Sequence, residues 1–413
     1  MRIASRLLAG SAVLAMTVAC SGLALADPPR GVTPRAGDVV GVGSDTTGYL
    51  LDQLALDYDK AHLKSGPLLY SWDPVNPATG QAGGRIVTKA ACPAMARPDG
   101  SAAGVSALIA NKTDPSDTTD YCIDFAGSSS VPTGGDPPCG SGGVCFIQLA
   151  RDAVTWAARD AASGGSDAPS SLTMTQLKDI YLCKITNWAA VGGRRAPIRP
   201  YLPQAASGTR TSWLIALGGG TPLKPGSCVR DDGNALQDNQ GVSKVLDNPE
   251  VIVPYSVADF LAQAYHDARC ARASCSGSPP CHPSATQDRF GCDRNGVLGL
   301  HQIGGSEPAL PWPLPRSACP KCAINPAFSR PFQRTVFLVV RYAPTPDHIP
   351  AYLEPFLAAS TAKVPGWICS APKARADIRD YGFEPLSGGA AAPAARVPGG
   401  PMALTQCGTP YLK

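Results

Sequence analysis

Short turns built from glycine and small hydroxyl residues occur four times in this chain, each beside an extended or helical apolar stretch. The clearest is Ser207-Gly208-Thr209-Arg210, which follows the extended run 198–202 and precedes the apolar run 213–217, where a helix can begin. A turn of this kind exposes backbone N–H groups and hydroxyl donors, and the start of the helix adds partial positive charge. A single such turn is most often a helix cap, so the prediction of an anion-binding site rests on all four turns together.

The other three turns lie upstream and are arranged in a similar way. They are Ser44-Asp45-Thr46-Thr47 between the strand 38–43 and the helical run 49–62, Gly100-Ser101 before the helical run 105–110, and Gly127-Ser128-Ser129-Ser130 after the strand 122–126. Alternating short strands and helices are typical of α/β layers with mostly parallel sheets. In such sheets ligands bind where strands end and helices begin, so the four turns are expected to outline one binding site.

Two longer apolar runs, 146–158 and 334–342, are suited to strands that cross between two halves of the molecule. A chain of 413 residues is long enough for two domains. Further helices are expected at 171–182, where the pattern is amphipathic with an N-terminal cap, and at 351–360 and 374–380.

The first 26 residues are typical of an export signal. Arg2 and Arg6 give a basic start, an apolar core follows, and Ala24-Leu25-Ala26 forms a small-x-small cleavage site before Asp27. The alternative is a lipoprotein in which Cys20 is the lipidated first residue. The apolar core is too short to span a membrane comfortably. We therefore expect an exported protein of the cell envelope, periplasm or medium, either soluble after cleavage or anchored through Cys20.

Cysteine usage agrees with export. The chain has 15 cysteines, and without Cys20 an even number remains, which favours disulfides in an oxidising compartment. Six of them crowd a Pro/Ser-rich segment with little apolar periodicity: Cys270, Cys275, Cys281, Cys292, Cys319 and Cys322. A segment that cannot bury a core needs covalent cross-links. A zinc site built from Cys319, Cys322 and His282 is the alternative.

Composition and motifs exclude several classes of function. The formal net charge is only +4 and no basic face is apparent, which argues against a nucleic-acid partner. The five histidines are scattered without metal-ligand spacing, and no G-x-S-x-G elbow or paired histidine supports a hydrolase. We expect no cofactor, no metal and no catalytic residues.

Several of these segments also resemble, in order, the phosphate-binding subunits of ABC importers, which are type II periplasmic binding proteins. Gly41-Val42-Gly43-Ser44-Asp45-Thr46 resembles the opening G-x-G-A-T-F turn of that family, and Gly100-Ser101-Ala102-Ala103-Gly104-Val105 resembles its G-S-S-G-G-V turn. Asp124-Phe125-Ala126-Gly127-Ser128-Ser129 resembles D-F-G-A-S-D, and Ser207-Gly208-Thr209 resembles the last phosphate turn. The most specific piece is 172–188, which resembles L-T-x-x-x-L-x-x-I-Y-L-G-K-I-x-x-W.

The resemblance implies an α/β fold with two lobes, each a mostly parallel sheet flanked by helices, joined by two crossover segments. Lobe one would comprise 36–147 and, after the return, 334–413 with the C-terminal tail. Lobe two would comprise 148–333 with the Cys/Pro-rich insertion at about 266–330, which the family does not share, and the signal would be 1–26.

The resemblance also implies a function: capture of phosphate, or a similar tetrahedral oxyanion, between the lobes by a monomer that delivers it to an ABC permease. The implied ligand-binding residues are Ser44, Asp45, Thr46, Ser101, Ser128, Ser129, Ser207, Gly208, Thr209 and Arg210. Asp124 is expected to serve structure, holding its turn through side-chain to backbone bonds.

Two positions depart from the family pattern. Ser129 stands where the family commonly has an aspartate that accepts the ligand's proton, and Pro203 stands where it commonly has an arginine. We hypothesise that Asp45 replaces the acceptor and Arg210 the cation. The identity of the oxyanion stays open, because an aspartate rejects fully ionised oxyanions whereas a serine can donate to them. Two alternatives also stay open: a secreted phosphatase-like hydrolase with a serine or threonine nucleophile, and a surface protein that kept the scaffold but lost the ligand.

Overall fold

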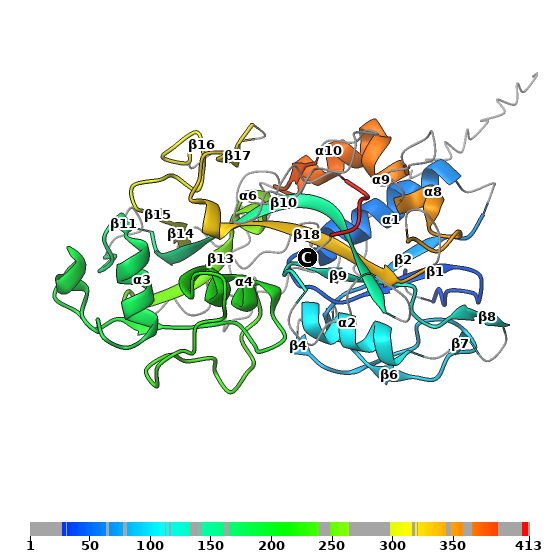
Figure 1. Cartoon of the computed structure of the whole chain (residues 1–413), viewed down its shortest axis with the longest axis horizontal. Helices are drawn as coiled ribbons and strands as arrows, with labels where there is room; N and C mark the ends of the chain where they lie inside the picture. Colours follow the sequence, from blue (N-terminus) through cyan, green and yellow to red (C-terminus); the bar gives the residue numbers. More distant parts are fainter. Residues whose placement is uncertain are drawn as a thin grey trace, which may run out of the picture.

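The protein folds into two lobes, as the sequence predicts, and two long strands run between them (Figure 1). The computed structural model describes residues 27–29, 31–62, 66–76, 81–111, 113–114, 117–132, 139, 143–160, 165–238, 248–263, 298–315, 319, 321–343, 348–357, 366–386 and 407–411. The expected signal with Cys20, the insertion segment 264–297 with four of its cysteines and His282, and the tail 387–406 lie outside the described residues.

Strands β10 (Val144–Arg159) and β18 (Gln333–Arg341) are the two crossing segments. They pair antiparallel from Val144 opposite Arg341 to Ala153 opposite Gln333. Their side chains are buried almost throughout, because both faces are covered by other parts of the chain. The two apolar runs of the sequence are thus confirmed as strands.

These strands lie at the centre of a nine-stranded sheet with the order β12-β13-β10-β18-β9-β1-β2, in which β14 and β19 also pair with β10. Outside the crossing strands the pairs of this sheet are parallel: β2 with β1, β1 with β9, and β12 with β13. Every antiparallel pair of the sheet includes β10 or β18. The α/β class with two lobes and two crossovers is therefore confirmed. The remaining strands of this sheet are β1 (Val39–Val42), β2 (Leu69–Trp72), β9 (Phe125–Ser128), β12 (Arg199–Pro200), β13 (Val251–Ser256), β14 (Leu298–Leu300) and β19 (Glu384–Pro385).

Helices cover the sheet in both lobes (Figure 1). The first lobe carries α1 (Gly48–His62), α2 (Ser101–Ala110), α8 (Glu354–Leu357), α9 (Trp367–Ser370) and α10 (Pro372–Asp380). The second carries α3 (Met174–Tyr181), α4 (Gly208–Leu217), α6 (Val257–Leu261) and the 3-10 turns η2 (Trp188–Val191) and η4 (Arg330–Phe332). Helix α10 begins two residues before the predicted start, because a proline is well suited to the first helical position.

Short two-stranded sheets complete the described part of the molecule. They are β3 (Val75–Asn76) with β4 (Gln81–Ala82), β5 (Arg85–Ile86) with β6 (Met95–Ala96), β7 (Thr113–Asp114) with β8 (Asp117–Tyr121), β11 (Ser171–Leu172) with β15 (Gln302–Ile303), and β16 (Ala309–Leu310) with β17 (Ala323–Ile324). No helix among the described residues combines the length and the apolar character that crossing a membrane requires.

The segment that most resembles the family folds as its pattern indicates. Thr173 caps α3 in a reciprocal capping box with Gln176, which satisfies two of the free donors at the helix start. Tyr181 and Trp188 are fully buried. This packing confirms the expectation that both side chains belong to the core rather than to a ligand site.

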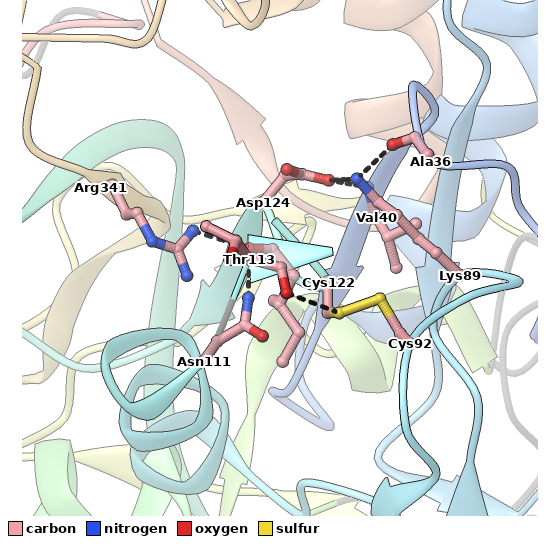
Figure 2. The surroundings of a disulfide bond; sticks show 10 residues. Ala36, Val40, Lys89, Cys92, Asn111, Thr113, Cys122, Asp124 and Arg341 are labelled. Atoms are coloured by element: carbon pink, nitrogen blue, oxygen red, sulfur yellow. Dashed lines mark hydrogen bonds and ion pairs between the residues drawn. A yellow bond between two sulfur atoms is a disulfide. The ribbon is translucent and has the colours of Figure 1, made fainter. Parts of the chain in front are cut away.

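A buried ion pair holds the start of β9 in the first lobe. Lys89 lies between the Asp124 carboxylate, at 3.1 Å, and the Ala36 carbonyl, at 2.9 Å (Figure 2). The same carboxylate oxygen of Asp124 accepts the Val40 backbone N–H at 2.7 Å. Asp124 therefore ties β9 to β1 through side-chain to backbone bonds, as expected, and fixes the strand that ends at Ser128.

Ten cysteines of the described residues form five disulfides: Cys92–Cys122, Cys139–Cys145, Cys183–Cys228, Cys319–Cys322 and Cys369–Cys407. The first closes the loop that carries α2 and lies beside Asp124 (Figure 2). The alternative of a zinc site at Cys319 and Cys322 is wrong for these two residues, because they are bonded to each other. No cluster of metal-ligating side chains occurs in the described ranges.

Replacing Lys89 with methionine will leave the Asp124 carboxylate buried without its cation. We expect the free energy of unfolding to fall by about 3–5 kcal/mol, the usual cost of breaking a buried ion pair. Lys60, which is mostly exposed and pairs with Asp57 at 3.1 Å, is the matched control, and Lys60→Met should cost less than about 1 kcal/mol. Urea unfolding of both variants checks this, and equal losses would contradict the assignment.

Candidate functional site

The start of α4 is fixed by a serine cap. Ser207 Oγ accepts the backbone N–H of Arg210 at 2.9 Å, and the same hydroxyl donates to the Asp238 carboxylate. The cap sets the first turn of the helix, so that the fully buried Thr209 lies with its Oγ1 3.3 Å from that of Thr46. This turn is a helix cap, and it also places a hydroxyl against the opposite lobe.

The start of α2 lies directly against that turn. Gly100, the residue before α2, has a φ of +91°, and a Cβ there would overlap the Gln204 side chain and the Ala206 carbonyl. Only glycine adopts this positive φ without strain, and glycine has no Cβ to make these overlaps. One residue into α2, the Ala102 N–H donates to the Ala206 carbonyl at 3.0 Å. The N-termini of α2 and α4 therefore meet at the boundary between the lobes.

Four hydroxyls, one from each of the four turns, come together at this boundary. We call Thr46, Ser101, Ser129 and Thr209 the hydroxyl cluster. Thr46 Oγ1 lies 3.0 Å from Ser129 Oγ, which in turn lies 3.3 Å from Ser101 Oγ. The Ser129 N–H donates to Ser101 Oγ at 3.0 Å. None of the four residues is more than 3% exposed, so the cluster is shielded from bulk water.

Gly208 allows the lobes to approach this closely. A Cβ at this position would overlap the hydroxyl oxygens of Ser129 and Ser101. Four residues further along α4, Ser212 Oγ donates to the Ser129 carbonyl at 3.1 Å. The first turn of α4 is thus packed on the Ser129 turn with no side chain between them at Gly208.

Arg334 brings a positive charge to the hydroxyl cluster. Its Nη2 lies 3.4 Å from Thr46 Oγ1, and its Nη1 donates to the Ser129 carbonyl at 3.1 Å. The guanidinium also pairs with Asp152, through Nε at 2.8 Å and Nη2 at 2.7 Å. Both residues are buried and lie opposite each other on the two crossing strands.

Asp238 brings a carboxylate to the same place. Its Oδ2 accepts from Thr46 Oγ1 at 3.0 Å, and its Oδ1 accepts from Ser207. The residue is 2% exposed. Because an ionised carboxylate has only acceptors, Asp238 can bind a ligand oxygen only if that oxygen carries a proton.

The turn of Ser44 and Asp45 is buried and incompletely hydrogen-bonded. Ser44 has a φ of +65°, an uncommon conformation for serine. Ser44 Oγ, Asp45 Oδ2 and Thr47 Oγ1 are buried without a hydrogen-bond partner among the described residues. Burial, and next the nearby Asp238 carboxylate, raise the pKa of Asp45 well above its usual range.

Two other predicted site residues point elsewhere. The Arg210 guanidinium donates to the Pro203 carbonyl at 2.8 Å and pairs with Asp231 at 3.2 Å, so its contacts lie outside the hydroxyl cluster. These contacts do not support the hypothesis that it replaces the missing cation. The Ser128 hydroxyl donates to the Ser130 carbonyl at 3.0 Å. It stabilises its own turn and makes no hydrogen bond to the hydroxyl cluster.

Asp99 links the two lobes next to the cluster. Its carboxylate accepts from Gln237 at 3.0 Å, and its backbone carbonyl accepts from the Gln204 side chain at 3.1 Å. Burial raises the pKa of Asp99 to about 6, although the Gln237 hydrogen bond acts in the opposite direction.

Arg334 and Asp238 are the two charged residues that the turn pattern does not predict. They bring one cation and one carboxylate to the hydroxyl cluster. One weak signal was present for Arg334, since Asp152 and Arg334 are among the few charged residues of the mostly apolar crossing strands. Asp238 lies 31 residues after Ser207 in an irregular segment and carries no comparable signal.

Comparison with known proteins gives one family and a set of similar structures. Residues 28–252 match the family described as the PBP superfamily domain. A search among curated proteins gives no match. A solved ABC-type phosphate transport receptor from Vibrio cholerae is 16% identical over 84% of this chain and 99% of its own, with a TM-score of 0.44. A phosphate binding protein from Stenotrophomonas maltophilia is 16% identical over 86% of this chain and 91% of its own, with a TM-score of 0.42.

The family match carries the assignment, because it covers more than half of the chain and includes all four turns of the hydroxyl cluster. The matching family is one of solute-binding proteins rather than enzymes. This chain belongs to the PBP superfamily.

Proposed function

We propose that this protein is exported and captures phosphate, or a similar tetrahedral oxyanion, between its lobes for delivery to an ABC permease. The observation that carries the proposal is the hydroxyl cluster, in which four buried hydroxyls from four separate turns face one another. A tetrahedral anion needs donors from several directions. Oriented donors that are shielded from water can replace the hydration shell that such an anion loses.

The helix starts around the cluster favour an anion as well. Both α2 and α4 are ten residues long and begin at Ser101 and Gly208, beside the cluster. The N-terminus of a helix carries partial positive charge and free N–H groups. Together with the Arg334 guanidinium, these groups supply the positive potential of the site.

Asp238 gives the site its proposed selectivity. An acceptor-only carboxylate attracts an oxyanion that still carries a proton and repels one that is fully ionised. Phosphate carries such a proton near neutral pH, whereas sulfate does not. The loss of the family aspartate at Ser129 therefore does not remove discrimination, because Asp238 takes over this role.

The remaining parts of the proposal follow the sequence expectations. Lobe one comprises 36–147 and 334–413, and lobe two comprises 148–333. The signal 1–26 is removed, or the chain is anchored through Cys20. The protein acts as a monomer without a cofactor. Calorimetry of the chain starting at Asp27 with phosphate, sulfate and arsenate tests the function directly, and no heat of binding with any of the three would refute it.

Replacing Thr209 with valine will remove one hydroxyl of the cluster without changing the shape of the side chain. A hydrogen bond to a charged group contributes about 1.5–3 kcal/mol, so we expect phosphate affinity to fall roughly 10- to 100-fold. Thr211→Val, on the same helix, is the matched control, because its hydroxyl donates to the Ser207 carbonyl instead. A similar loss in both variants would show that the effect is structural.

Replacing Asp238 with asparagine will exchange an acceptor-only group for one that can also donate. We expect the ratio of phosphate to sulfate affinity to fall, since sulfate is no longer repelled. Competition titrations with both anions measure the ratio. An unchanged ratio would remove Asp238 from the selectivity mechanism.

Replacing Gly208 with alanine will place a methyl group against the Ser129 and Ser101 hydroxyls. Overpacking at a close contact costs about 1–3 kcal/mol, so phosphate affinity should fall roughly 5- to 100-fold. Gly37→Ala is the control, because its Cβ would meet nothing within 4 Å. X-ray scattering with saturating phosphate should show a less compact molecule for Gly208→Ala only.

A further inference from the structure

The charges around the hydroxyl cluster are unbalanced. Among the described residues, the Arg334 guanidinium is the only cation that contacts the cluster, and it already pairs with Asp152. Asp238 contacts the cluster as well, and Asp45 is the neighbour of Thr46 in the first turn. An oxyanion would bring further negative charge to a place where carboxyls already outnumber cations.

Asp45 is the carboxyl least able to remain ionised there. It is 4% exposed, and its Oδ2 has no hydrogen-bond partner in the described part of the chain. The hydroxyls on either side, of Ser44 and Thr47, do not satisfy it and are themselves unpartnered in the same residues. Burying a carboxylate oxygen without a donor is costly, and burial favours the protonated form of the group.

The largest charge effects on Asp45 come from groups of its own sign, whereas the Arg334 guanidinium, which contacts the neighbouring Thr46, is paired with Asp152. After burial, the causes that raise the pKa of Asp45 are the carboxyls of four residues: Asp238, Asp99, Asp259 and Asp73. They belong to both lobes: Asp259 lies on α6, and Asp238 follows the α4 region. The repulsion from these two carboxyls therefore depends on the closed arrangement of the lobes.

We propose that the protein captures its oxyanion together with one proton from solvent, which Asp45 holds as a neutral carboxyl while the lobes are closed. The proposal rests on the proposed function and deepens it. On closure the Asp45 carboxylate gains a proton and becomes a carboxylic acid, and on opening the proton returns to solvent. In the closed form Asp45 adds a donor beside Thr46 instead of a second negative charge, while Asp238 remains the acceptor for the ligand's own proton.

The sign of the pH dependence follows from linkage. The pKa of Asp45 is higher in the closed form than in an open one, so closure is favoured at low pH. This contribution is fully present below the open-state pKa, about 3.9 for an ordinary aspartate. As the pH rises toward the closed-state pKa this contribution is lost, and the affinity falls about tenfold for each pH unit.

Calorimetry in buffers of different ionisation enthalpy counts the protons taken up when inorganic phosphate binds. Asp45→Asn is the most informative variant, because the amide has nearly the shape of the neutral carboxyl but cannot take up a proton. At a pH above the open-state pKa of Asp45 we expect the wild type to take up more protons per phosphate than Asp45→Asn does, by up to one. The variant should bind at pH 8 at least as tightly as the wild type. Asp59→Asn is the control, because burial raises the pKa of Asp59 to about 7 as well, but its carboxylate accepts the Leu69 N–H on β2 and makes no hydrogen bond to the hydroxyl cluster. This variant should keep the wild-type proton count.

Two results would overturn the inference. One is an equal proton count in the wild type and Asp45→Asn. The other is a loss of the extra proton in Asp59→Asn as well, because the proton count would then not report on Asp45. Infrared difference spectra of the wild type give a readout that needs no variant: phosphate should produce the carbonyl band of a protonated carboxyl, and its absence would also refute the proposal. Failure of the wild type to bind phosphate at all would refute the proposed function, whereas binding without the extra proton would refute this inference alone.

Discussion

The pair of Arg334 and Asp152 is the interaction on which the rest of the site depends. The two residues face each other on β18 and β10, and so they join the crossing strands at the level of the hydroxyl cluster. Asp152 also accepts the Ser256 hydroxyl at 2.9 Å and the Ala258 N–H at 3.0 Å, which fixes the start of α6. Arg334 reaches in the other direction, to Ser129 and Thr46. A buried pair is costly unless its remaining hydrogen bonds are made, and here these bonds orient the turns that would hold the ligand.

The local parts of this structure could be predicted from the sequence, because each depends on a few neighbouring residues. The amphipathic pattern at 171–182 predicts α3, although the helix begins only at Met174 because Ser171 and Leu172 pair with β15 and Thr173 is the cap. The apolar runs predict the crossing strands by their length. The meeting of Thr46 with Thr209 depends on chain segments far apart in sequence, and only the repetition of the turn pattern indicated it. The resemblance to a known family added the order of the turns, and with it the expectation of two lobes.

The charged residues of the site could not be predicted in the same way. Arg334 reaches Thr46 across 288 positions of sequence, and Asp238 reaches it across 192. Arg210 seemed the better cation because it adjoins the turn, but its guanidinium has closer partners in the Pro203 carbonyl and Asp231. A charge can be supplied from any element that the fold brings near. The roles of Asp and Arg in such a site are therefore less tied to sequence position than the roles of glycine and the hydroxyl turns.

Main chain of one lobe lies directly against the other lobe at Gly100 and Gly208. A Cβ at Gly100 would overlap the Gln204 side chain and the Ala206 carbonyl, and a Cβ at Gly208 would overlap the Ser129 and Ser101 hydroxyls. Side chains can change rotamer to admit a larger ligand, but main chain that is held in strands and helices has little freedom to move. The approach of the two lobes at these glycines is thus set by the fold itself. Exchanging side chains could alter which charges lie at this contact, but a larger ligand could be admitted only by moving the two lobes apart.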